Sequence, residues 1–227
     1  MSQRAGTARV RTARVWHLVV ATGVGVGLLL QLWLVLAGGT DVNSGDSGTA
    51  VPLGTRLVRL LSYFTIQSNI LVFVSVLALA IDPRRDGPLW RVLRLDGLLG
   101  IVVTGLVYEV ALRSLLDLHG LAWWTDTLLH VFAPWLTLLG WLLFGPRPRI
   151  RWSTVARAMI WPAAWLLYTF VHGAVSGWYP YPFLDVTELG YPVALRNTAL
   201  VLALGILLAS AYKLLDDRLP ALQQRSQ

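Results

Sequence analysis

Six apolar segments, each about as long as a membrane is thick, dominate this sequence. A helix needs about 20 mostly apolar residues to cross the hydrocarbon. Segments of this kind lie at about 15–39, 57–81, 96–116, 125–144, 156–176 and 193–213. Only 14% of the residues are charged, whereas soluble domains carry about 25%. The sequence therefore predicts an all-α polytopic membrane protein, a bundle of six transmembrane helices that forms one integral membrane domain over residues 1–227.

The connections between these segments alternate in charge, which predicts their orientation. Fifteen of the nineteen lysines and arginines belong to the N-terminus, the second and fourth connections and the C-terminal tail. Positive charge collects on the cytoplasmic side of membrane proteins. We therefore expect a multi-pass protein of the cell membrane with both termini in the cytoplasm, and outer loops at 40–55, 117–124 and 177–192.

Composition also limits which partners, cofactors and catalytic groups the protein can have. The net charge of +7 comes from arginine clusters between apolar segments, where they set topology, so we expect no nucleic-acid partner. The absence of cysteine excludes disulfides and thiol catalysis. No two of the four histidines have the spacing of metal ligands on one helix. We expect no metal and no cofactor.

Polar residues nevertheless gather at one depth inside the apolar segments. Counted at about 1.5 Å per helical residue, they fall in the outer half of the bilayer. Ionisable groups in hydrocarbon are costly and usually mark a substrate site, an ion path or an internal pair. The second to fifth segments supply Thr65, Gln67, Ser68, Asn69, Glu109, Arg113, Asp126, His130 and His172.

Helical spacing selects among these residues. Asp126 and His130 are four residues apart and share a helix face, so the acid can orient the imidazole. Thr65 and Asn69 have the same spacing. Glu109 and Arg113 have it too, and a structural ion pair is the more economical interpretation for them. His172 lies near the end of its segment, where a polar cap is the more ordinary role.

The last outer loop is rich in aromatics and prolines. Residues 171–185 read VHGAVSGWYPYPFLD, a stiff amphipathic segment suited to the membrane surface. Its residues Trp178 and Tyr181 are placed to cover a cavity between the outer helix ends, and we include them among the candidate substrate contacts.

Three blocks of sequence resemble the androgen-induced-gene family of six-pass membrane proteins. This family includes the androgen-dependent TFPI-regulating protein. They are Tyr63-Phe64-Thr65-Ile66, the stretch LLHVFAP from Leu128 to Pro134, and VHGAVSGWYPYPFLD. Their order and spacing match over most of residues 55–215. Animal members are threonine hydrolases that cleave fatty acid esters of hydroxy fatty acids. The resemblance implies that Thr65 is the nucleophile and His130 its partner.

The sequence thus supports one leading hypothesis and two alternatives. The leading one is a membrane-embedded hydrolase of amphiphilic lipid esters with Thr65, His130 and Asp126 as catalytic residues. Its candidate substrate contacts are Asn69, Glu109, His172, Trp178 and Tyr181, with Asn69 or His172 as an oxyanion donor. The alternatives are a non-enzymatic lipid-binding, ion-binding or transport protein and a structural membrane subunit. Membrane lipids or a lipid ester are the expected partners, and the oligomeric state stays open.

Overall fold

The fold is a helical bundle. The computed structural model describes residues 2–38 and 51–219, and these residues contain helices but no strand. Six helical stretches are long and apolar enough to cross a membrane: Gly6–Leu36, Phe64–Ile81, Pro88–Leu115, Gly120–Phe144, Trp152–Ser176 and Val186–Arg218. The expected fold class is confirmed, and the stretches indicate a multi-pass membrane protein.

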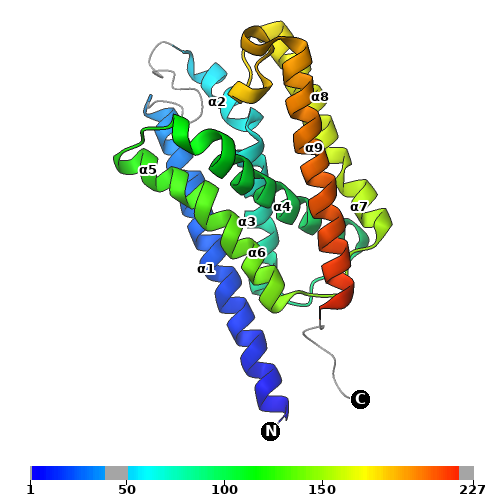
Figure 1. Cartoon of the computed structure of the whole chain (residues 1–227). Coiled ribbons are helices and arrows are strands. Elements are labelled where there is room, and N and C mark those ends of the chain that lie inside the picture. The colour runs from blue at the N-terminus through cyan, green and yellow to red at the C-terminus, as the bar shows by residue number, and fades with distance from the viewer. Residues whose placement is uncertain (1, 39–50, 220–227) are drawn as a thin grey trace.

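The chain runs up and down through these stretches (Figure 1). The start of α1 and the end of α9 lie at one end of the bundle, while α2, α5 and the connection from α8 to α9 lie at the other. The α-helices are α1 (Ser2–Leu36), α2 (Leu53–Ser62), α3 (Phe64–Ile81), α4 (Pro88–Val107), α5 (Gly120–Thr127), α6 (Ala133–Phe144), α7 (Trp152–Ala158), α8 (Ile160–Ser176) and α9 (Val186–Arg218). Two π-helices, η1 (Tyr108–Leu112) and η3 (Leu128–Phe132), and two 3₁₀-helices, η2 (Arg113–Leu115) and η4 (Pro182–Leu184), complete them.

Several helix boundaries differ from the predicted ones. The second predicted span is two helices, α2 and α3. The third span begins at Pro88, so Arg94 belongs to a helix and not to a connection. The predicted loops at 117–124 and 177–192 contain the first turns of α5 and α9, and the loop at 40–55 lies mostly outside the described residues. Hydropathy detects only the part of a helix in hydrocarbon, and polar turns extend beyond it.

The core lies between α1, α3, α4 and α6. Val24, Val72, Ile101 and Ala133 are fully buried there. About 72% of the apolar window of the α4 span is buried, against 22% for the α7–α8 stretch and 17% for α9. Large apolar side chains cover the outer surface, as a surface in contact with lipid requires. The last two stretches are thus the least buried of the six and lie at the edge of the four-helix core.

The break between α2 and α3 has its own hydrogen-bond partners. Tyr63 is extended there, with φ −67° and ψ 126°. An interrupted helix inside a membrane needs new partners for the carbonyls it frees. The Gln67 side chain donates to the carbonyl of Leu61 at 2.9 Å, and the Trp165 indole donates to that of Ser62 at 2.9 Å. Side chains therefore stabilise the break and start α3 at Phe64.

Candidate active site

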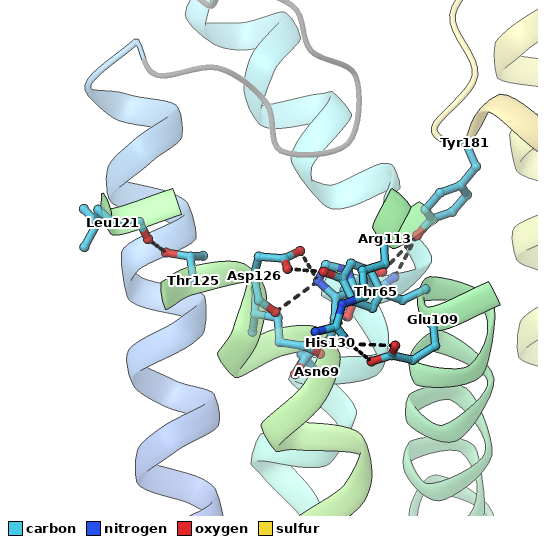
Figure 2. Close-up of polar contacts among 11 residues, drawn as sticks. Thr65, Asn69, Glu109, Arg113, Leu121, Thr125, Asp126, His130 and Tyr181 are labelled. Atoms are coloured by element: carbon cyan, nitrogen blue, oxygen red, sulfur yellow. Dashed lines mark hydrogen bonds and ion pairs between the residues drawn. The ribbon is translucent and has the colours of Figure 1, made fainter. Parts of the chain in front are cut away.

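Thr65 lies in the first turn of α3, directly after this break. Its side chain is buried, with 3% exposure. The first N–H groups of a helix lack partners within the helix. The Thr65 N–H donates instead to the hydroxyl of Tyr181, at 3.1 Å, and the two hydroxyl oxygens are also 3.1 Å apart. Figure 2 shows Tyr181 reaching toward Thr65 from the segment after α8. Thr65 thus sits at the positive end of a helix dipole.

The segment that carries Tyr181 is held against the bundle by aromatic packing. The Tyr181 ring lies 5.7 Å from the ring of Tyr63 and is stacked 5.3 Å from that of Phe183. Tyr179 covers Gly173 of α8 so closely that a Cβ at residue 173 would lie 2.2 Å from the Tyr179 ring. Burial raises the pKa of the Tyr179 phenol. The contact between Gly173 and Tyr179 therefore positions the chain that presents Tyr181.

Gly173→Ala is expected to destabilise the protein by about 1–3 kcal/mol, since an added methyl must displace the Tyr179 ring. Gly205→Ala is the matched control, because a Cβ in this other helical glycine meets nothing within 4 Å. Removing a glycine from a helix interior gains about 0.5–1 kcal/mol. Unfolding of the two variants in the same detergent checks the difference. Equal stability would show that the tight contact has no energetic role.

A π-helix carries His130. Pro134 follows four residues later and has no N–H to donate to the His130 carbonyl, so the regular helical bond is missing. The backbone instead adopts the wider turn of a π-helix, η3. Gly105 of α4 makes room, because a Cβ there would lie 2.8 Å from Pro134. The widened turn and the close helix approach together place the buried imidazole, 2% exposed, inside the bundle.

Asp126 holds the imidazole through one nitrogen. The Nδ1 atom of His130 lies 2.9 Å from the Asp126 carboxylate and 3.2 Å from the Asp126 carbonyl oxygen (Figure 2). Both neighbours are acceptors, so Nδ1 carries the proton and Nε2 presents a lone pair. Nε2 is buried and has no hydrogen-bond partner in the described part of the chain. This is the arrangement of a general base.

Tyr108 completes this arrangement, and the sequence did not single it out. Its hydroxyl donates to the second carboxylate oxygen of Asp126, and its ring stacks on His130 at 4.5 Å. It is the first residue of the π-helix η1, so two π-helices meet at the site. A tyrosine in an apolar span gives no signal of such a role by itself, because the contact crosses between helices.

Asn69 joins the two halves of the site. Its amide nitrogen donates to the carbonyl of Thr65 at 2.9 Å and to that of Leu129, next to His130, at 3.2 Å. Because both amide protons are used, this geometry gives Asn69 the role of a spacer between α3 and η3. No hydrogen bond links the side chains of Thr65 and His130 themselves in the residues that the structure describes.

An apolar groove ends at Thr65. It has an empty volume of about 800 Å³, counting the part that opens to the outside. Thr65 and Tyr181 form its polar end. Residues 99–107 of α4 and 198–205 of α9 line its length, which is roughly 10–12 Å at 1.5 Å per residue. Trp161 and Trp165 of α8 form another wall. The groove therefore lies between α4 and the two last helices, α8 and α9.

Three of the predicted substrate contacts, Glu109, His172 and Trp178, lie away from the groove. Glu109 forms a bidentate pair with Arg113, at 2.9 and 2.7 Å, on a part of the bundle that is exposed. His172 stacks on Tyr168 and meets Trp178 edge to face at 5.9 Å. Trp178 also packs on Tyr63. Asn69, Asp126 and His130 do not line the groove either, and they lie beside Thr65 in the interior of the bundle.

Comparisons with known proteins add no relative. No family model, curated protein or solved structure matches the chain. The resemblance to the androgen-induced-gene family therefore rests on the three blocks of sequence quoted above. Among the described residues, no group of three or more histidine and carboxylate side chains could hold a metal ion.

Proposed function

We propose that the protein is a membrane-embedded hydrolase of amphiphilic lipid esters, with Thr65 as the nucleophile and His130 as the base. The observation that carries the proposal is the position of Thr65. Its hydroxyl lies at a helix N-terminus and at the polar end of an apolar groove, within a bundle that also buries an oriented histidine with an open nitrogen. The resemblance to threonine hydrolases supports the same pair of residues.

The first half of the reaction forms an acyl-threonine. Substrate binding turns the Thr65 hydroxyl from Tyr181 toward His130, and Nε2 takes its proton as the oxygen attacks the ester carbonyl. The Tyr181 hydroxyl and the Thr65 N–H at the start of α3 are the donors for the negative oxygen that develops, and one such donor is worth about 2.7–4 kcal/mol. His130 then returns the proton to the alkoxide of the leaving alcohol as the C–O bond breaks.

The second half releases the acid. A water molecule takes the place of the alcohol and gives its proton to His130 as it attacks the acyl carbon. The bond to Thr65 breaks, the threonine oxygen recovers the proton from His130, and a carboxylic acid leaves. Asp126 stabilises the imidazolium in both halves, and Tyr108 keeps the carboxylate in place.

Topology supports a lipid as the substrate. Under the positive-inside rule both termini face the cytoplasm, which places Thr65 in the outer half of the cell membrane. The groove would hold an acyl chain along α4 and α9 with its ester at Thr65. A transport protein or a lipid-binding protein would also use the groove. Neither function, however, requires the oriented His130.

A substitution at Gly205 tests the groove as the acyl site. Gly205 shares a helix face with Thr198 and Leu202, lines the groove, and has open space at its Cβ. Gly205→Leu is expected to lower kcat/KM for long-chain esters at least about tenfold, because each lost methylene contact is worth roughly 1–3 kcal/mol. Activity on short-chain esters of the same alcohol should be retained.

The matched control is Ala203→Leu, which places a leucine side chain on an exposed part of α9. Hydrolysis of a chain-length series by the purified protein in detergent checks both variants. Loss of long-chain activity in both, or in neither, would contradict the assignment of the groove. Binding of the esters without turnover by the wild type would favour a lipid-binding protein instead.

A further inference from the structure

A second cavity lies at the other end of the bundle, and none of its lining residues also lines the groove at Thr65. The start of α4, the segment between α6 and α7 and the end of α9 enclose it. Four arginines and two acids line it: Arg85, Arg91, Arg94, Arg149, Asp86 and Asp216. The four guanidinium groups exceed the two carboxylates by two positive charges.

Asp86 is engaged by two arginines, and Asp216 is engaged through one of its two oxygens. Asp86 accepts two hydrogen bonds from the Nε and Nη2 atoms of Arg91, each at 2.7 Å, and also pairs with Arg149. One oxygen of Asp216 accepts the main-chain N–H groups of Arg149 and Ile150 at 2.5 and 2.7 Å. Neither carboxylate is bonded to Arg94 in the described part of the chain. The excess positive charge therefore lies on Arg94 and on Arg85, which packs over the Trp90 ring.

Arg94 is the unusual member of this cluster. It is 7% exposed, and only its Nη1 atom has a contact, with Ser75 at 3.5 Å. Its Nε and Nη2 atoms have no hydrogen-bond partner among the described residues. A buried charged group with unsatisfied donors is strongly unfavourable. These two atoms form the same forked edge with which Arg91 binds a carboxylate. The edge matches two oxygens of an anion.

We propose that this cavity binds a phosphate group, held by the forked edge of Arg94 and by the charge of its arginine neighbours, and that the group belongs to the head of a membrane lipid. The cavity lies at the arginine-rich end of the membrane-spanning helices, and Trp90 and Trp141 line it beside the arginines. Aromatic and basic residues of this kind meet lipid headgroups at membrane interfaces. The proposal does not depend on the hydrolase activity.

The experiment compares two lipids that differ only in the phosphate. Full-length protein in detergent is unfolded by heat with added phosphatidic acid, with diacylglycerol of the same acyl chains, or with inorganic phosphate. A ligand that binds only the folded protein raises the apparent Tm. We expect phosphatidic acid to raise it by several degrees and diacylglycerol to leave it unchanged. An equal rise with inorganic phosphate would support the same site and name free phosphate as its ligand.

Substitutions assign the effect to Arg94. Arg94→Met should abolish the rise yet fold well without lipid, because it removes an unpaired buried charge. Arg94→Lys keeps the charge without the fork and should weaken lipid binding at least about tenfold, which covers the case in which Arg94→Met does not fold. Arg157→Met, an exposed arginine of α7 outside the cavity, should keep the full rise. A rise that survives in both Arg94 variants, or no rise with any phosphate compound, would overturn the proposal.

Discussion

Thr65→Ala is expected to lower lipid-ester hydrolysis at least about a thousandfold while the protein still folds and inserts. The substitution removes the proposed nucleophile, and losses of this size or larger follow removal of a nucleophile in other hydrolases. Thr65→Val should be equally inactive because it keeps the shape and loses only the hydroxyl. Thr65→Ser keeps a hydroxyl at the start of α3 and should retain measurable turnover.

The chain offers a close control for this experiment. Thr198 is also a buried threonine on the groove, but its hydroxyl donates to the carbonyl of Ala194 in its own helix at 2.8 Å. Thr198→Ala should therefore keep activity within a few fold of the wild type. Initial rates on one ester, measured with equal amounts of each purified variant, compare Thr198→Ala with the Thr65 variants. Substantial activity in Thr65→Val would remove Thr65 from the mechanism.

His130→Ala is expected to have the second large effect, a loss of about a thousandfold or more, since both halves of the reaction need a base. His172→Ala is its control, because His172 packs against Tyr168 and Trp178, whereas Asp126 pairs with His130. Added imidazole should restore part of the activity of His130→Ala by occupying the space of the lost ring. A purely structural histidine would show no such rescue.

Asp126→Asn should also lower activity, by roughly 10²–10⁴-fold, since the acid acts by orienting His130 and stabilising its charged form. Imidazole rescue that is equally strong in Asp126→Asn and in His130→Ala would contradict this division of roles.

The sequence predicted those features that depend on local spacing. Six spans follow from the lengths of the apolar segments, and the described helices confirm them. The contact of Asp126 with His130 follows from a separation of one helical turn, and the structure has it at 2.9 Å. The pairing of Glu109 with Arg113 follows in the same way. Such contacts need no knowledge of how the helices pack.

Contacts between distant segments could not be predicted in this way. Tyr181 and Thr65 were both candidates, yet no periodicity joins residues 116 positions apart. Tyr108 carries no charge that would mark it as unusual in an apolar span. The break at Tyr63 lacks a glycine or proline, and side chains distant along the chain or beyond the break, such as Gln67 and Trp165, supply partners for its free carbonyls. Arg94 was assigned to a connection because it is charged, whereas packing buries it in α4.

A covalent probe tests the central role of Thr65 most directly. A fluorophosphonate reacts with an activated hydroxyl, which displaces fluoride, and leaves a stable adduct that peptide mass spectrometry can locate. We expect the wild-type protein to carry the adduct on Thr65, His130→Ala to react far more slowly, and Thr65→Ala to stay unlabelled. An adduct on any other residue, or labelling that persists in Thr65→Ala, would contradict a threonine-based hydrolase at this site.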